Sequence, residues 1–181
     1  MNSAMDSLPR RVFLSGTAVA LLAGDEALAA DQPPVGTAAA DAAILNTALG
    51  AELEAIAAYQ LAADSGLLDA SVKSLALTFQ GQHQEHAQLL AKTIAKLGGK
   101  PSAAKAKYDF PKDKLKTQAD VLRFAASLEQ AAVSAYLGAI PQFASRDLSK
   151  AAASILGDEA MHWAVLRQAL GEAPVPSAFV S

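Results

Sequence analysis

The chain of 181 residues is 52% hydrophobic but only 6% aromatic, and its formal net charge at pH 7 is −3. This length suits one ordinary domain with short extensions, and without a strongly basic run a nucleic-acid partner is not expected. The sequence contains no cysteine, which excludes disulfides, thiolate chemistry and metal sites built on cysteine.

The first predicted element is an export signal over residues 1–29, which we do not expect to belong to the folded domain. Arg10 and Arg11 precede an apolar run at 12–23, and an Ala-x-Ala sequence follows at 27–29, which is the layout of a cleaved signal peptide. The run is shorter than the ~20 residues that span a bilayer, so no stable membrane anchor is expected. The arginine pair followed by Val-Phe-Leu is typical of a twin-arginine signal, with an ordinary secretory signal as the alternative. Either type predicts a periplasmic or secreted protein.

Four helices are predicted after a linker at 30–38, because apolar residues recur at three- and four-residue steps. Glycine or proline follows the second, third and fourth of them as a stop signal, and no segment has the pattern of a strand. A long lysine-rich connection separates the second helix from the third, whereas the other two connections are short. Two tight helical hairpins joined by one crossover predict an all-α four-helix bundle over 39–171, with a tail at 172–181, rather than a plain up-and-down bundle. The expected helices cover residues 39–64, 70–97, 118–140 and 147–170.

The three histidines of the chain all lie in the second and fourth of these helices, within an internal repeat. His83 and His86 correspond to Glu159 and His162 with an offset of 76 residues. The first and third helices carry leucine, glutamate and tyrosine at seven-residue steps, with an offset of 77, which places each triplet on one helix face. The triplets are Leu45, Glu52 and Tyr59 in the first helix, and Leu122, Glu129 and Tyr136 in the third.

Glu52 and Glu129 are each predicted to lie on an apolar helix face, which is a costly place for a carboxylate. An unpaired charge in a bundle core costs several kcal/mol or takes up a proton, and two facing glutamates repel each other unless a cation lies between them. A pair of divalent metal ions removes this difficulty, because carboxylates and imidazoles lose their protons as they bind. Glu159 and His162 are three residues apart on one helix face, so both can reach one centre. Glu54 has small neighbours one turn away and is expected on a solvated flank.

Three stretches of the sequence resemble the ferritin-like superfamily: LNTALGAELEAIAAY in the first helix, EHAQLLAKTIAKLGG in the second and DEAMHWAVLRQALG in the fourth. The chain is similar to small exported bacterial ferritin-like proteins and, more distantly, to rubrerythrin and bacterioferritin. The resemblance implies a ferritin-like bundle in which Glu52 and Glu129 are lone glutamate ligands. Glu159 and His162 would form one Glu-x-x-His motif, and His86 would be the histidine of the other.

The sequence departs from that pattern at His83, where the family's second helix would carry a glutamate. Glu85 points about 100° away from His86 on the helix, and Gln82 is neutral, so neither replaces the missing carboxylate. Two divalent ions on three carboxylates would lack one negative charge, which a hydroxide or a substrate anion can supply. Three consequences of a histidine at position 83 are compatible with the sequence: a different metal preference, one bound metal ion instead of two, or a site that has lost its activity. The expected metal ligands are Glu52, His83, His86, Glu129, Glu159 and His162.

The leading functional hypothesis is an exported protein with two non-haem metal ions, iron first and manganese second. The resemblance implies oxidation of Fe(II) by oxygen or peroxide, or reduction of a peroxide, at this site. Tyr59 and Tyr136 are expected to donate hydrogen bonds to ligand carboxylates, and a redox role for them is a weaker hypothesis. The alternative is a metal-free or degenerate bundle with a structural, binding or stress-related role. The fold leaves open whether the protein is an enzyme and whether it forms a homo-oligomer.

Overall fold

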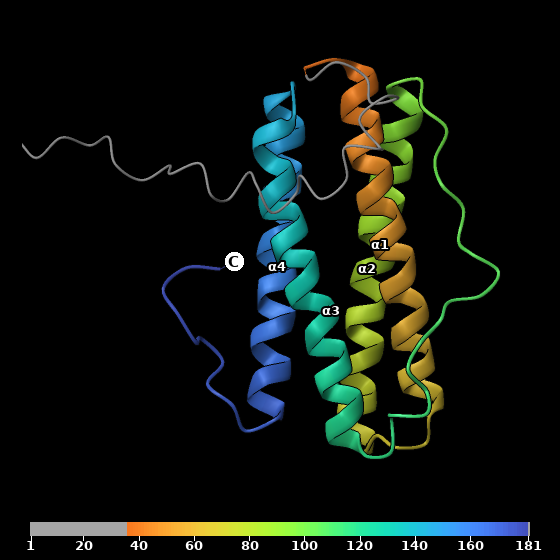
Figure 1. The fold of residues 1–181 in the computed structure, drawn as a ribbon, viewed down its shortest axis with the longest axis vertical. Helices are drawn as coiled ribbons and strands as arrows, with labels where there is room; N and C mark the ends of the chain where they lie inside the picture. Colours follow the sequence, from red (N-terminus) through yellow and green to blue (C-terminus); the bar gives the residue numbers. More distant parts are fainter. Residues whose placement is uncertain (1–35, 181) are drawn as a thin grey trace, which may run out of the picture. The chain divides into compact units, whose positions relative to one another are not determined.

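Four α-helices make up most of the computed structural model, which describes residues 36–180 (Figure 1). Each begins and ends within one residue of its predicted bounds, and the described part of the chain contains no strand. The predicted export signal lies outside the described residues, and none of the described helices is long and apolar enough to cross a membrane. The elements in chain order are α1 (Ala38–Asp64), α2 (Ala70–Lys96), α3 (Gln118–Ala139), the short 3-10 helix η2 (Ile140–Gln142) and α4 (Arg146–Ala169).

The helix starts are fixed by side chains that accept a hydrogen bond from a backbone N–H of the first turn. Thr37 caps α1 and Asp69 caps α2 in this way. Thr117 and Asp120 form a reciprocal capping box at α3, and Ser145 caps α4. Because these capping interactions join residues close together in the sequence, the helix bounds predicted from the sequence agree with the structure to within one residue.

The helices pair as two hairpins, α1 with α2 and α3 with α4, and the two hairpins contact each other far more sparsely. The connection between α2 and α3 runs along the outside of the helices, so α2 and α3 point in the same direction (Figure 1). Asn46 of α1 holds the start of this crossover. Its side-chain amide donates to the Lys100 carbonyl oxygen at 2.9 Å, and its Oδ1 accepts from the Ser102 N–H at 2.8 Å. The predicted ferritin-like topology of two hairpins and one long crossover is therefore confirmed.

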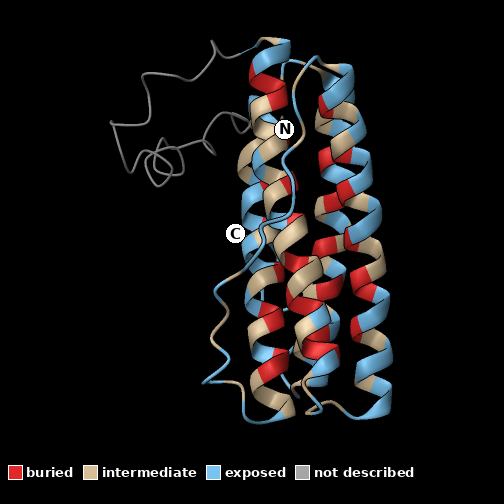
Figure 2. Ribbon diagram, turned by 90° about the vertical axis from the view of Figure 1, so that its right-hand side faces the viewer, coloured by how far each residue is buried: buried red, intermediate tan, exposed pale blue. Residues whose placement is uncertain are grey.

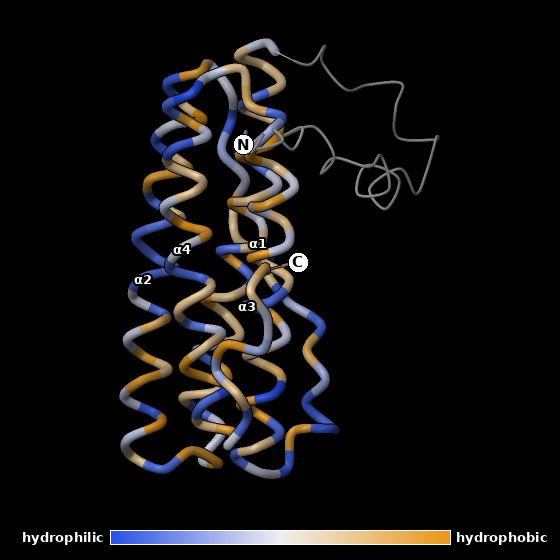
Figure 3. Tube along the Cα trace, turned by 90° about the vertical axis from the view of Figure 1, so that its left-hand side faces the viewer, coloured by the Kyte–Doolittle hydropathy of each residue, from blue (hydrophilic) through white to orange (hydrophobic). Residues whose placement is uncertain are grey.

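Two apolar clusters form the core, and a layer of buried polar residues lies between them. Buried residues face inward along all four helices (Figure 2), and hydrophilic positions interrupt the apolar ones midway along α2 and α4 (Figure 3). Each cluster takes residues from every helix, so the polar layer is held in place from both ends. The first cluster contains Leu45, Leu49, Ala87, Leu90, Ile94, Tyr136, Ala152 and Ile155. The second contains Tyr59, Ala76, Phe79, Leu122, Ala125, Ala126 and Leu166.

Candidate metal centre

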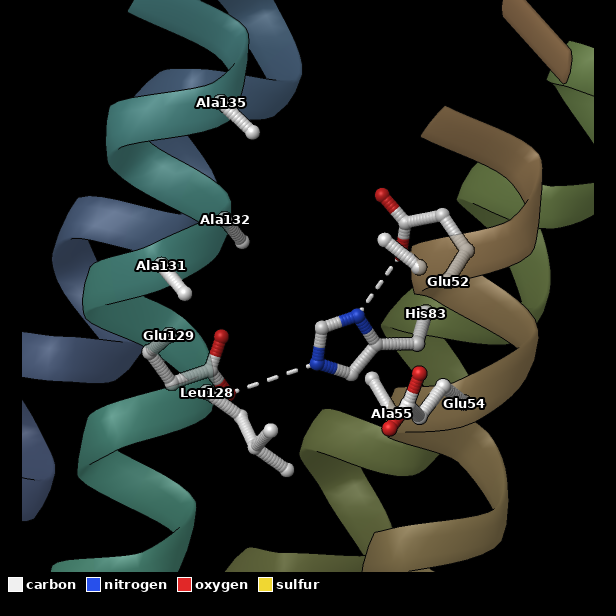
Figure 4. Close-up of a pocket in the computed structure, with 10 residues that line it drawn as sticks. Glu52, Glu54, Ala55, His83, Leu128, Glu129, Ala131, Ala132 and Ala135 are labelled. Atoms are coloured by element: carbon white, nitrogen blue, oxygen red, sulfur yellow. Dashed lines mark hydrogen bonds and ion pairs between the residues drawn. The ribbon is translucent and has the colours of Figure 1, made fainter. Parts of the chain in front are cut away.

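The six predicted metal ligands come together in the polar layer, although they belong to four different helices. Five of the six side chains have at most 3% of their surface exposed, and His86 is the exception at 14%. Figure 4 shows Glu52 of α1, His83 of α2 and Glu129 of α3 pointing into the space between α1 and α3. The ionisable residues of the sequence repeat therefore lie close together in the structure.

One group of donor atoms surrounds the Nδ1 side of the His83 ring. His83 Nδ1 lies 2.8 Å from Glu52 Oε2 and 3.6 Å from Glu159 Oε1. His86 Nδ1 lies 3.5 Å from the same oxygen of Glu52 and 3.1 Å from the same oxygen of Glu159. Two nitrogens and two oxygens thus converge at this point.

A second group of donor atoms surrounds the Nε2 side of the same ring. His83 Nε2 lies 3.3 Å from Glu129 Oε1, and His162 Nδ1 lies 3.5 Å from that oxygen. Glu159 completes this group through its other oxygen, Oε2, which is 3.7 Å from His162 Nδ1. His83 and Glu159 therefore belong to both groups, and each turns one donor atom to either side.

Several donor atoms of the centre are buried without a hydrogen-bond partner. They are Nδ1 of His86 and of His162, Oε2 of Glu129 and both carboxylate oxygens of Glu159. A buried polar atom without a partner costs free energy, so these atoms need a cation or protons to compensate them. Imidazole nitrogens and carboxylate oxygens are suitable ligands for iron, zinc and copper, and carboxylates also suit manganese. The donor set therefore fits a divalent cation in either group, with two nitrogens and two oxygens in each. Because a neutral imidazole has one lone-pair nitrogen, His83 ligates in one group at a time unless it loses both ring protons.

The two tyrosines of the repeat hydrogen-bond to the glutamates crosswise between the hairpins. The Tyr59 hydroxyl donates to Glu129 Oε1, and the Tyr136 hydroxyl donates to Glu52 Oε1 at 2.6 Å. Burial, followed by the charge of the bonded glutamate, raises the pKa of both phenols, so both stay protonated as donors. The expected hydrogen bonds are present, and they fix the orientation of both carboxylates.

The three imidazoles are protonated in the metal-free centre. Burial disfavours the charged form of His83, but hydrogen bonds to Glu129 and Glu52 outweigh it and raise the pKa to about 10. At His86 and His162 burial likewise disfavours the charged form, but the nearby glutamate carboxylates outweigh it and raise both pKa values to about 9. Without metal, the histidines therefore act as the cations of the polar layer.

The three glutamates divide into two ionised groups and one that is harder to ionise. Burial opposes ionisation of Glu52 and Glu129, but hydrogen bonds to the imidazoles outweigh it, and the pKa of each is lowered. At Glu159 burial dominates and raises the pKa. Glu159, which belongs to both donor groups, is thus the carboxyl that gains most from a bound cation.

Metal-free protein is expected to lose stability as the pH rises from 6.5 to about 10. The folded imidazoles bind protons more tightly than unfolded ones, whose pKa is 6.5. Their contribution is therefore complete below pH 6.5 and disappears as the pH passes through the folded pKa values of about 9 to 10. Urea denaturation across this range, with chelator present, measures it. A free energy of unfolding that is constant or rises across this interval would contradict the protonated cluster.

Two further residues contact the centre, and sequence reasoning missed both. His162 Nε2 donates to Gln82 Oε1 at 2.8 Å. Asp158 Oδ2 lies 3.4 Å from Nε2 of both His86 and His162. Gln82 and Asp158 are related by the same 76-residue offset as the ligands, and each lies four residues before a histidine, on the same helix face. The repeat therefore contains the signal for both contacts, although neither residue type completes a Glu-x-x-His motif.

A cavity of about 250 Å³ lies between α1 and α3 and reaches the centre (Figure 4). Three of the predicted ligands, Glu52, His83 and Glu129, line it. Glu54 also lines it and is partly buried, because α3 faces this side of α1 across the cavity, so its flank is less open than the sequence predicted. The remaining lining residues are Ala51, Ala55, Leu128, Ala131, Ala132 and Ala135.

Comparison with known proteins identifies the architecture. The sequence pattern of the family described as "Ferritin-like domain" matches residues 40–172. A solved structure of a conserved hypothetical protein, rv2844, from Mycobacterium tuberculosis is 24% identical with a TM-score of 0.67, and the match covers 77% of this chain and 96% of that one. A solved structure of ferritin-like, diiron-carboxylate proteins from Bacillus anthracis str. Ames is 23% identical with a TM-score of 0.63, and the match covers 72% of this chain and 94% of that one. At these identities the likeness shows the fold alone, and no curated protein matches the chain.

Proposed function

The chain belongs to the ferritin-like domain family, and from this premise we propose that its core holds two divalent metal ions and oxidises Fe(II) with oxygen or peroxide. The observation that carries the proposal is the pair of four-residue donor groups that share His83 and Glu159. The Bacillus anthracis structure, named as diiron-carboxylate, has the same fold, which supports iron as the first metal to test. Manganese is the second, because carboxylate oxygens suit it as well.

Each donor group would hold one ion at its own end of the centre. Glu52 and His86 belong to one group, and Glu129 and His162 belong to the other. Bound ions would supply electrons to an oxidant and polarise it. Tyr136 binds Oε1 of Glu52, and Glu52 Oε2, now 2.8 Å from His83 Nδ1, would face a cation once that imidazole proton is released. Tyr59 binds Oε1 of Glu129, the same oxygen that faces the imidazoles, while Glu129 Oε2 has no hydrogen-bond partner.

The charge of the centre supports two ions better than the sequence suggested. Glu52, Glu129 and Glu159 supply three negative charges, one short of neutralising two divalent ions. Asp158 adds a fourth carboxylate within 3.4 Å of two of the histidines. Metal binding would release the imidazole protons, so affinity is expected to rise with pH.

The reaction balances with Fe(II) as the reductant. Each of two Fe(II) ions loses one electron, the O–O bond of hydrogen peroxide breaks, and two protons complete two water molecules. The chain's part is to hold the reactants in a buried, oriented site, which keeps water from competing for the same positions.

We also propose that the protein acts outside the cytoplasm. The arginine pair, apolar run and small residues of 1–29 support this proposal. Fractionation of cells that express the full chain tests it, with replacement of Arg10 and Arg11 by lysine as the control for the twin-arginine type.

Anaerobic loading with Fe(II), followed by oxygen or hydrogen peroxide, is expected to give a fast oxidation phase of about two irons per chain. The phase should be absent when Glu52 and Glu129 are both replaced by alanine, because each donor group then loses its own carboxylate. Stopped-flow absorbance of the ferric product measures it. Oxidation at the rate of free Fe(II) in both proteins would remove the proposed activity.

A second candidate function is that of a bundle that works without metal. It is favoured by the place of the His83 ring between Glu52 and Glu129, at 2.8 and 3.3 Å, where an imidazolium balances both charges. The stability of the protein with and without metal separates the two candidates, since only a metal protein gains stability from the ion.

A further inference from the structure

We infer that metal cations and uncharged oxidants reach the centre from opposite sides of the bundle, cations past Asp158 between α2 and α4, and oxidants through the alanine-lined cavity between α1 and α3. This inference rests on the proposed function and assigns a separate path to each of its two kinds of substrate. Figures 1 and 4 place α1 and α3 on one side of the bundle, with α2 and α4 behind them.

The α2–α4 side offers the ligands that a hydrated cation needs. Asp158 and His86 have 20% and 14% of their side-chain surface exposed, whereas the five predicted ligands other than His86 have at most 3%. Asp158 Oδ2 lies 3.4 Å from Nε2 of His86 and 3.4 Å from Nε2 of His162. A cation that exchanges one water for the Asp158 carboxylate therefore meets imidazoles of both donor groups next.

Four of the five donor atoms without a hydrogen-bond partner lie at or behind these two partly exposed residues, and the fifth, Glu129 Oε2, belongs to the cavity side. Both oxygens of Glu159, the residue after Asp158, are buried without a hydrogen-bond partner, as are Nδ1 of His86 and of His162. From Asp158 through His86 to Glu159 the side chains become more buried, and neither Glu159 oxygen has a hydrogen-bond partner. This gradient draws a cation inward, because each step replaces water by a ligand that has no other partner.

The α1–α3 side has the opposite character. Its cavity of about 250 Å³ has walls of five alanines and Leu128, which offer a cation nothing in place of its water. The volume is roughly eight times the ~30 Å³ that one water takes up in the liquid, so it admits a peroxide or a small alkyl hydroperoxide. It ends on Glu52, His83 and Glu129, which face both donor groups. Among the three glutamates that line the cavity, Glu54 alone belongs to neither donor group. If cations entered through this cavity instead, Glu54 is the carboxylate that they would meet first.

The cation path is tested by the rate of Co(II) uptake by the full, metal-free chain without oxidant, followed by the visible absorption of bound Co(II). Asp158→Asn is expected to slow uptake about tenfold, the lower end of electrostatic steering effects, and to weaken the dependence of the rate on salt. Glu54→Gln and Glu85→Gln remove one charge each and should leave the rate unchanged. Equal slowing by Glu54→Gln, or an unchanged rate in Asp158→Asn, overturns the path.

The oxidant path is tested on protein already loaded with Fe(II). Ala132→Leu narrows the cavity and is expected to lose the fast phase, with a larger loss for tert-butyl hydroperoxide than for hydrogen peroxide. The alkyl substrate takes up two electrons and two protons and gives one alcohol and one water. Ala135→Leu is the second variant, because Ala135 is exposed and the substitution should not disturb folding. Ala153→Leu, exposed on α4 and outside the cavity, is the control.

The outcomes separate the inference from the function on which it rests. Ala132→Leu and Ala135→Leu should both take up Co(II) at the wild-type rate while they slow the oxidant. If these variants slow both Co(II) uptake and reaction with the oxidant, or slow neither, the inference of separate paths is wrong even if the protein oxidises Fe(II). A wild-type chain that binds no Co(II) and no Fe(II) overturns the inference and the proposed function together.

Discussion

Glu129→Ala is expected to remove most of the stability that divalent metal adds to the wild-type protein. A ligand that binds only the folded state at 100 times its Kd raises the free energy of unfolding by about 2.7 kcal/mol. Glu129 Oε1 is the oxygen that faces both His83 Nε2 and His162 Nδ1, at 3.3 and 3.5 Å. Its loss leaves the second donor group with only one carboxylate, and the metal-dependent increment should fall accordingly.

The quantity to compare between proteins is the increase in the free energy of unfolding on addition of metal, rather than the free energy of unfolding itself. Glu129→Ala also leaves the Tyr59 hydroxyl without its acceptor, which costs about 1–3 kcal/mol whether or not metal is present. Urea denaturation with chelator and with Mn(II) or anaerobic Fe(II) gives the increment for each protein. Glu54→Ala is the matched control, because Glu54 lines the same cavity but belongs to neither donor group. Equal increments in all three proteins would show that the glutamate repeat does not bind the metal.

The helices were predictable because their limits depend on local interactions. Thr117 and Asp120, for example, form a capping box between neighbours in the chain, and Pro141 ends α3 by its own geometry. The gathering of the six predicted ligands followed from the repeat, since equal spacing in two hairpins places equivalent residues at equivalent heights. Their role as ligands remains a prediction, which the metal experiments decide.

The contacts that depend on side-chain orientation between helices were not predictable from the sequence. That Asp158 of α4 reaches His86 of α2 depends on how the two hairpins meet, and no spacing within one helix specifies it. The partly buried position of Glu54 likewise depends on the helix opposite it. The sequence indicates that His83 departs from the family pattern, whereas the position of its ring between both donor groups depends on the side-chain orientation.

His83 is the residue at which the stability of the metal-free bundle and the binding of metal compete. As an imidazolium it lies between Glu52 and Glu129, and Glu159 Oε1 is 3.6 Å from its Nδ1. A glutamate at this position would give the charge pattern that the family resemblance implies. It would also remove the cation that holds the metal-free centre together.

His83→Glu is therefore expected to make the fold depend on metal. Without metal, four buried carboxylates then face one another with only His86 and His162 as cations, and breaking such a buried pair costs about 3–5 kcal/mol. With two divalent ions, the four buried carboxylates of the variant balance four positive charges without the partly exposed Asp158, whereas the centre of the wild type has only three buried carboxylates. The metal-dependent increase in the free energy of unfolding should therefore exceed that of the wild-type protein. Urea denaturation at neutral pH, with chelator and with Mn(II), measures both effects. Gln84→Glu, an exposed change on the same helix, is the control and should alter neither.

Metal-free His83→Glu protein as stable as the wild type would mean that the imidazolium does not hold the polar layer. Loss of stability without rescue by metal would mean that His83 has a packing role that a carboxylate cannot fill.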